Sequence, residues 1–145
     1  MPRSAIARIP RPFLTTAAAV VALTATLMAS APTMADAAQL PRSGTLVGQS
    51  DHVTTGRVTI ERDGDRTIVV LHGDFSLDGA PSPTLGFSRN GRFDVATEFA
   101  PLKSLEGEQR YEAPRGIAVS TYDAFTVWCS KFAVPLGPVG ELEAA

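Results

Sequence analysis

The sequence has few of the residues that cross-link small domains or that are typical of the active sites of common enzymes. It contains one cysteine, one tryptophan and two histidines in 145 residues. One cysteine cannot form a disulfide within the chain, so the fold must depend on a hydrophobic core. The sequence also lacks a phosphate-binding or dinucleotide-binding glycine loop, a zinc-protease motif and a nucleophile elbow. Any chemistry is therefore left to a few reactive side chains outside these motifs.

Residues 1–37 have the order of a secretory signal peptide. Three arginines precede an uncharged stretch at positions 13–35, and small residues that suit signal peptidase end at Ala37. This order predicts cleavage after Ala37 and a secreted or otherwise extracytoplasmic mature chain. A retained membrane anchor is the alternative, but the apolar core is rich in alanine and threonine and shorter than the roughly 20 residues of a spanning helix. No second apolar run of that length follows, so no membrane span is expected in the mature chain.

The mature chain is expected to be one acidic domain. Removing 37 of the 145 residues leaves 108, which suits a single compact unit. The removed part holds three arginines and one aspartate, so ten basic and fourteen acidic residues remain, a formal charge of −4. Such a surface is a poor partner for nucleic acid or anionic lipid. We expect a short linker over 38–43 and the folded domain over 44–142.

The pattern of the mature chain predicts an all-β fold, as a single-domain antiparallel β-sandwich or barrel with little or no helix. Short runs of β-branched and aromatic residues recur every 8–12 residues or so, separated by glycine, proline and aspartate. Hairpin turns are predicted at Asp63-Gly64 and Asn90-Gly91, because glycine and asparagine tolerate positive φ. Any helical turn is expected only within about 100–108.

Alternation within these runs predicts which side chains face the core. Successive side chains of a strand point to opposite faces, so an error of one residue exchanges the inner and outer sets of a whole strand. The predicted core positions are Val58, Ile60, Ile68, Val70, Phe75, Leu85, Phe87, Phe93, Val95, Tyr111, Phe125, Val127 and Phe132.

The only cysteine lies beside the only tryptophan in an expected strand at 124–130. Alternation places Cys129 on the face of Phe125 and Val127, and Trp128 on the opposite face. Two interpretations of Cys129 stay open: a redox thiol or soft ligand of a metal or haem iron, and a small buried core residue. Trp128 could stack on a planar cofactor or fill the surface of the sheet.

A β-bulge is expected directly after this strand, at Ser130-Lys131. Without it, Phe132 and Val134 would lie on the face opposite Cys129. With it, they join the inward face and Lys131 points to solvent, which gives a coherent apolar face. Bulges are also common beside functional sites, where they re-aim a side chain.

Four landmarks occur in order along the mature chain. They are Gly44 followed by HVTTGRVTI (52–60), LHGDFSLDGAPSP (71–83), LKSLEGEQRYEAP (102–114) and FTVWCSKFAV (125–134). Together they resemble the DM13 family, and the resemblance extends from about Gly44 to Leu142. One departure is visible, because Ser82 and Thr84 follow the loop prolines where that family commonly has an acidic residue.

The resemblance implies a small extracytoplasmic β domain with a redox or electron-transfer role centred on Cys129. In this family the cysteine is proposed to act as a bare thiol or as the ligand of a group such as haem. Cys129, Trp128 and His52 are thus the candidate cofactor contacts, and a membrane, periplasmic or extracellular redox partner is implied. The alternative is a β-sandwich binding or cell-envelope interaction module in which Cys129 is a core residue. In both cases a non-catalytic domain is expected rather than an enzyme.

His52 and His72 are the only histidines. With Cys129 they could supply three ligands to a metal, but 20 residues separate the two histidines and neither has a neighbour at ligand spacing. Histidines of this kind more often lie at the surface and form hydrogen bonds. No metal site is therefore predicted, and His52, which falls within a family landmark, is the better candidate for a cofactor contact.

Overall fold

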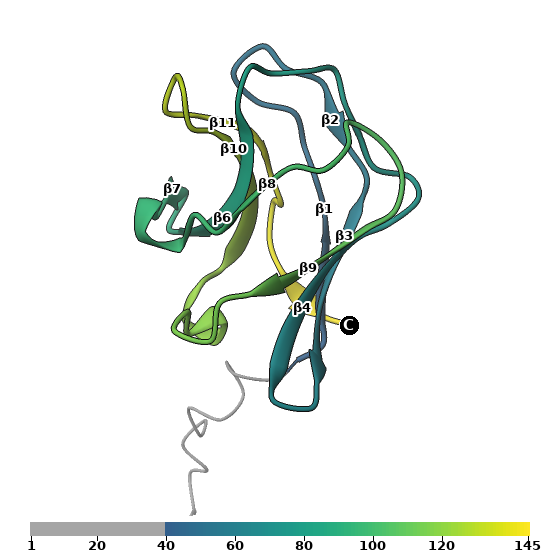
Figure 1. The fold of residues 1–145 in the computed structure, drawn as a ribbon, viewed down its shortest axis with the longest axis vertical. Helices are drawn as coiled ribbons and strands as arrows, with labels where there is room; N and C mark the ends of the chain where they lie inside the picture. The colour runs from purple at the N-terminus through teal and green to yellow at the C-terminus, as the bar shows by residue number, and fades with distance from the viewer. Residues whose placement is uncertain (1–39) are drawn as a thin grey trace, which may run out of the picture. The chain divides into compact units, whose positions relative to one another are not determined.

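The structure, a computed structural model, describes residues 40–145, which form an all-β fold, as predicted (Figure 1). The signal peptide predicted at 1–37 lies outside the described residues. The first sheet contains, in spatial order, β12 (Glu143–Ala144), β1 (Arg42–Thr45), β3 (Arg57–Asp63), β4 (Arg66–Leu71) and β9 (Gln109–Ala113). All its strand pairs are antiparallel. No helix within the described residues is long and apolar enough to cross a membrane.

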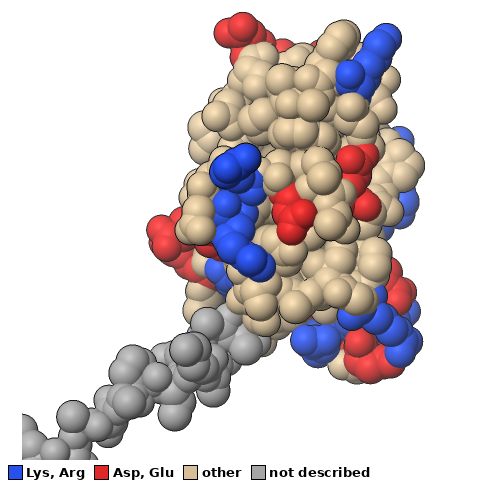
Figure 2. Space-filling model, turned by 90° about the vertical axis from the view of Figure 1, so that its left-hand side faces the viewer, with Lys and Arg blue, Asp and Glu red and all other residues tan. Residues whose placement is uncertain are grey.

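The second sheet carries the segment with the cysteine. It contains, in spatial order, β11 (Val134–Pro138), β10 (Ala124–Cys129), β6 (Pro83–Arg89) and β7 (Arg92–Phe93), and β8 (Ala100–Pro101) also pairs with β6. A third, two-stranded sheet pairs β2 (Thr54–Thr55) with β5 (Ser76–Leu77). Figure 1 shows the first two sheets facing each other, and Figure 2 shows basic and acidic side chains separated by uncharged surface on the outward side of the second.

Both predicted hairpins are present. Asp63 pairs with Arg66 around a turn in which Gly64 has a φ of 61°. Asn90 and Gly91 connect β6 to β7 with φ values of 52° and 73°. In the Asn90-Gly91 turn, both central residues have positive φ, which is the geometry of a type I′ turn, and the twist of such a turn matches that of the paired strands. Local turn chemistry therefore sets these two connections.

Within residues 40–145, helical structure is limited to two single 3₁₀ turns, η2 (Val95–Thr97) and η3 (Val119–Thr121). Neither lies within 100–108, so the predicted position of a helical turn is wrong. That interval instead begins with β8, whose Ala100 pairs with Leu85. The side chain of Asp94 begins η2 by accepting a hydrogen bond from the Ala96 amide at 3.0 Å.

The hydrophobic core lies between the two large sheets. From the second sheet come Leu85, Phe87, Phe125, Val127 and Cys129, and all are buried as predicted or implied by alternation. The first sheet contributes Val58, Ile60, Val69, Leu71 and Tyr111. The ring of Phe87 packs edge-on against Phe125, with 5.8 Å between centroids. Burial of these apolar side chains stabilises the fold, which has no internal disulfide to add to that stability.

Strand β4 is buried on both faces, and the prediction chose the wrong one for the central core. Ile68 and Val70 are buried, but Val69 and Leu71 are the residues that join the core cluster. The reason is that the run Ile-Val-Val-Leu is apolar throughout, so alternation cannot identify its inner face. Because side chains of a strand alternate between its two faces, a shift of one residue exchanges the inner and outer sets of β4, and this is the error that the prediction made.

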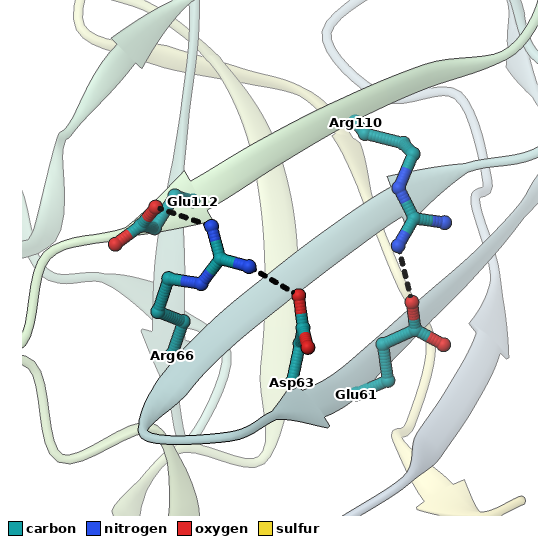
Figure 3. Close-up of polar contacts among 5 residues, drawn as sticks. All are labelled: Glu61, Asp63, Arg66, Arg110 and Glu112. Atoms are coloured by element: carbon teal, nitrogen blue, oxygen red, sulfur yellow. Dashed lines mark hydrogen bonds and ion pairs between the residues drawn. The ribbon is translucent and has the colours of Figure 1, made fainter.

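Ion pairs cover the outward face of β4 (Figure 3). Arg110 on β9 reaches Glu61 on β3 at 2.6 Å, across the strand that lies between them. Arg66 contacts Asp63 at 2.5 Å and Glu112 at 3.7 Å. The aliphatic stems of such arginines shield apolar residues beneath them, although exposed ion pairs of this kind add little stability of their own.

Three other predicted core residues lie elsewhere. Val95 is 69% exposed because the chain leaves the strand at Asp94 and enters η2. Phe132 is 61% exposed because it lies in a turn. Phe93 is half-buried on the outward side of the second sheet, where it packs against Trp128.

The bulge predicted at Ser130-Lys131 is wrong, because the chain reverses there. Cys129 pairs directly with Val134, and residues 130–133 form the turn between β10 and β11. The Ala133 amide donates to the Cys129 carbonyl at 2.8 Å, and Ala133 has a φ of 52°. The register shift between these strands occurs earlier, between Val127 and Trp128.

Gly56→Ala tests the close approach of Gly56, which lies between β2 and β3, to Phe75, which directly precedes β5. Gly56 has a φ of 118°, and a Cβ there would lie 2.5 Å from the Phe75 Cα. Strain and a backbone clash together should lower the free energy of unfolding by about 2–4 kcal/mol. Gly73→Ala is the control, since a Cβ at Gly73 meets nothing within 4 Å, and it should change stability by less than about 0.5 kcal/mol. Urea unfolding checks both, and equal effects would contradict the packing described here.

Candidate functional site

Strand β10 connects the core to the outward surface of the second sheet. It lies between β6 and β11, with Phe125 opposite Phe87 and Trp128 opposite Thr84. Its side chains alternate, so Phe125 and Cys129 enter the core while Trp128 points to the outward side. The predicted opposite orientation of the only cysteine and the only tryptophan is thus present in the structure.

Cys129 is a buried free thiol. Its side chain is 1% exposed and belongs to the core cluster. On its two sides the strand pairs place Pro83 and Val134. It lines neither the large cavity described below nor the three smaller ones formed by described residues. Contact between this sulfur and a second molecule therefore requires local opening of the fold.

A haem held by Cys129 does not fit this environment. An axial ligand needs an open approach to its sulfur, and the planar macrocycle needs a cavity beside it. The thiol instead faces packed core residues, is 1% exposed, and lines none of four cavities formed by residues 40–145. The residues around Cys129 are thus suited to a bare thiol and unsuited to a bound macrocycle.

Trp128 forms a parallel stack with Phe93 on the outward side. Their ring centroids are 4.3 Å apart and the ring planes differ by 7°. The type I′ turn returns the chain so that Phe93 pairs with Ser88, and its ring then lies over Gly86. A Cβ at Gly86 would come within 2.6 Å of the Phe93 ring, so the stack depends on the absence of a side chain there.

This aromatic stack lines a cavity of about 630 Å³. The β6–β7 hairpin supplies Arg92 and Phe93 on one side, and β11 supplies Pro135 and Pro138 on the other. Trp128 of β10 lies between these two walls in the strand order. We name this space the β10 cavity. It opens on the side of the domain that Figure 2 displays, where basic and acidic side chains are separated by uncharged surface.

The β10 cavity also has polar lining side chains, which are Gln49, Ser88, Arg92, Asp123, Thr126 and Glu141. Ser88 and Thr126 bond to each other through their hydroxyls at 2.6 Å and are buried. Arg92 is exposed and has no ion-pair or hydrogen-bond partner among residues 40–145. The carboxylates of Asp123 and Glu141 also line the cavity, and Asp123 accepts a hydrogen bond from the Asn90 amide at 2.7 Å.

The sequence held one signal for this cavity that our prediction did not use. Gly86 interrupts a strand, and a strand glycine often marks the close approach of another group. The hairpin at Asn90-Gly91 then determines that Phe93 is the group that approaches. Arg92 and the two prolines carry no such signal, because their position depends on how β7 and β11 flank the sheet.

The two histidines are not brought together with Cys129. His52 bonds through Nδ1 to Asp78 at 2.9 Å, and His72 bonds through Nε2 to the Thr59 hydroxyl at 2.7 Å. No group of three or more metal-ligating side chains occurs among the described residues. His52 thus connects two loops beside the β2–β5 pair. It does not itself line the β10 cavity, although its amide donates at 3.1 Å to the carbonyl of Gln49, which does.

Tyr122 is an additional polar aromatic that the sequence did not single out. Its hydroxyl donates to Asp94 at 2.9 Å, and the Arg89 guanidinium lies 4.6 Å from its ring centroid. The hydrogen bond that this hydroxyl donates to Asp94 raises the pKa of Tyr122 above its ordinary value. This bond ties η2 to the segment before β10 and so supports the hairpin that carries Phe93.

Comparison with known proteins gives one match. A family model described as Electron transfer DM13 matches residues 45–140. The matched segment includes both large sheets except for β12 and all but the last residue of β1, and it contains Phe93, Trp128 and Cys129. No curated protein and no solved structure matches the chain.

Acid titration tests the His52–Asp78 contact. The Asp78 carboxylate accepts the Val53 amide and the His52 ring nitrogen, and these bonds hold the pKa of Asp78 below its ordinary 3.8. A lowered pKa in the folded state stabilises the fold above the ordinary value, and this stabilisation is lost as pH falls through the folded pKa.

Asp78→Asn should therefore lose less stability than the wild type as the pH falls below about 4. Asp51→Asn is the control, because Asp51 is an exposed carboxylate directly before His52, in the loop before β2, and neither contact of Asp78 involves it. It should keep the acid response of the wild type. Thermal unfolding across the acid range measures this, and identical profiles for Asp78→Asn and the wild type would refute the linkage.

Proposed function

The chain belongs to the DM13 family, and on that premise we propose that it is an extracytoplasmic electron-transfer domain with Cys129 as its redox-active group. One observation carries the proposal. Cys129 and Trp128 are consecutive residues of β10, with the thiol in the core and the indole at the β10 cavity. Their Cα atoms are about 3.8 Å apart, so an electron has a short covalent path between the buried sulfur and the surface.

Burial determines which redox chemistry suits this thiol. Disulfide exchange and oxygen-atom transfer both need a second molecule to touch the sulfur. Electron transfer needs only a short path, and Trp128 provides a half-buried conjugated ring on the outward side. The partner would therefore meet the indole at the β10 cavity, and Cys129 would never leave the core.

The proposed step is a one-electron exchange. The Cys129 thiol loses one electron and its proton and becomes a thiyl radical. The electron passes through Trp128 to a high-potential metal centre of a partner protein, such as a ferric haem, which is reduced to ferrous. The proton passes to water that reaches the sulfur when the exposed turn of residues 130–133, directly after the cysteine, opens locally. The reverse transfer restores the thiol, and only the S–H bond is broken and remade.

The same burial supports a second candidate function. Cys129 is 1% exposed and packs as one member of the core cluster. A binding or cell-envelope interaction module would use the β10 cavity or another surface and need nothing from the thiol. Substitution of Cys129 separates the two functions, because only the electron-transfer role requires sulfur.

Secretion is part of the proposal and rests on the order of residues 1–37. Signal peptidase should release a chain that begins at Ala38, because small residues occupy the positions before the cut. Protein purified from the culture medium or periplasm of its native host should give this N-terminus by mass spectrometry. A chain that retains Met1 and sediments with membranes would instead support a retained anchor.

Cys129→Ala should retain the fold and lose the redox signal. Removing one buried sulfur should lower the free energy of unfolding by about 1–2 kcal/mol. The measurement is the number of equivalents of hexachloroiridate(IV), a high-potential one-electron oxidant, that the protein reduces in the fast phase of stopped-flow mixing. The wild type should reduce one equivalent more than Cys129→Ala.

Val127→Ala is the matched control. It removes methyl groups from the same inward face of β10 and should destabilise the fold by about 1–3 kcal/mol, but it keeps the thiol. It should therefore keep the fast equivalent. If Cys129→Ala keeps it as well, or the wild type shows none, Cys129 is an ordinary core residue and the binding module is the better function.

A further inference from the structure

We propose that the β10 cavity binds a planar, uncharged aromatic compound with carbonyl groups, of the quinone class, stacked on the Trp128–Phe93 pair. The inference rests on the proposed electron-transfer function, which makes a redox-active ligand appropriate. The binding itself is argued from the shape and chemistry of the cavity and does not require the thiol.

The aromatic stack provides a preformed surface for a planar ring. Trp128 and Phe93 already lie parallel, 4.3 Å between centroids and 7° between planes. Gly86 keeps the Phe93 ring in place because no side chain stands beneath it. A conjugated ligand can extend this stack, since aromatic groups favour offset parallel contact and bury a large area when they do so.

The walls of the cavity suit a rigid and mostly apolar ligand. Pro135 and Pro138 face the hairpin from β11, and their rings restrict the motion of that side. A volume of about 630 Å³ lies within the range of roughly 300–1,000 Å³ that small-molecule sites occupy. This space accommodates a one-ring or two-ring compound against the indole.

The charges at the rim favour a neutral hydrogen-bond acceptor. Arg92 lines the cavity and has no ion-pair partner among the described residues, so its donors are available. Asp123 and Glu141 line the same cavity and would repel an anion. A cation would be repelled by the positive charge of Arg92. A carbonyl oxygen can accept from the guanidinium and brings no net charge toward the two carboxylates.

The position of Cys129 makes such binding reversible. Thiols add to quinone rings: the sulfur electron pair forms a bond to a ring carbon, the thiol proton goes to a carbonyl oxygen, and the proton on the attacked carbon moves to the other oxygen, which leaves a sulfur-substituted hydroquinone. Cys129 lies on the inward face of β10 and lines no part of the cavity. The ligand should therefore stack on one side of the strand while the thiol on the other side stays unmodified, and the mass of the protein should not change.

Binding of 1,4-naphthoquinone to the protein purified from its native host tests the inference. Trp128 is the only tryptophan, so its fluorescence reports directly on the cavity. We expect saturable quenching with one ligand bound per chain, confirmed by equilibrium dialysis. Dialysis with Trp128→Leu should show binding at least tenfold weaker, because the stacking surface is lost.

Arg92→Gln should weaken binding by about threefold to tenfold, through loss of the charged donor. Arg62→Gln is its control, because Arg62 is an exposed arginine on β3 away from the cavity and also has no ion-pair partner within residues 40–145. It should bind as the wild type does. Thermal unfolding of each variant verifies that it is folded.

Quenching that rises linearly without saturation would overturn the inference, because it indicates collision rather than a site. So would binding that is unchanged in both Trp128→Leu and Arg92→Gln, or saturable binding of glucose with none of the quinone. Failure here is distinct from failure of the proposed function, since Cys129→Ala should bind naphthoquinone normally. If naphthoquinone binds but the wild type shows no extra fast equivalent, the quinone site is supported and the redox role of Cys129 is refuted. If the extra equivalent is present but naphthoquinone does not bind, the redox role is supported and the quinone site is refuted.

Discussion

Burial of the inward face of β10 is the constraint on which the rest of the site depends. Phe125, Val127 and Cys129 fill the space between the two sheets, where no disulfide assists. A shift of one residue in this strand would place Trp128 in the core and Cys129 outside. The apolar core therefore holds the indole at the surface and the thiol in the interior at the same time.

That arrangement both restricts and protects Cys129. A sulfur enclosed by packed side chains cannot ligate a haem or exchange disulfides while the domain is folded, and it is equally hidden from oxidants that must touch it. Its inward position is compatible with two roles, a redox centre reached by electrons alone and a small core residue. These differ in whether the sulfur matters apart from its volume, and that is why a substitution that changes packing but keeps the thiol is informative.

The outward side of the same strand is built by segments that surround it. Gly86 on β6 makes room for Phe93, a type I′ turn returns that residue to the sheet, and Tyr122 holds the capping Asp94 of the next turn. β11 completes the opposite wall. Each of these contacts also stabilises the fold, so the aromatic part of the β10 cavity is built into the sheet, while residues between strands, such as Gln49 and Glu141, complete its lining.

Local chemistry in the sequence determined the fold class, the two glycine hairpins and the inward direction of Cys129. These follow from strand period and turn preference, which act over a few residues. Tertiary structure alone decided which face of β4 is central, because its apolar run has no readable alternation. It also decided that residues 130–133 turn back, since that turn contains no glycine or proline and places Ala133 at positive φ. The β10 cavity likewise required contacts between positions far apart in the chain, Phe93 with Trp128, which no local pattern encodes.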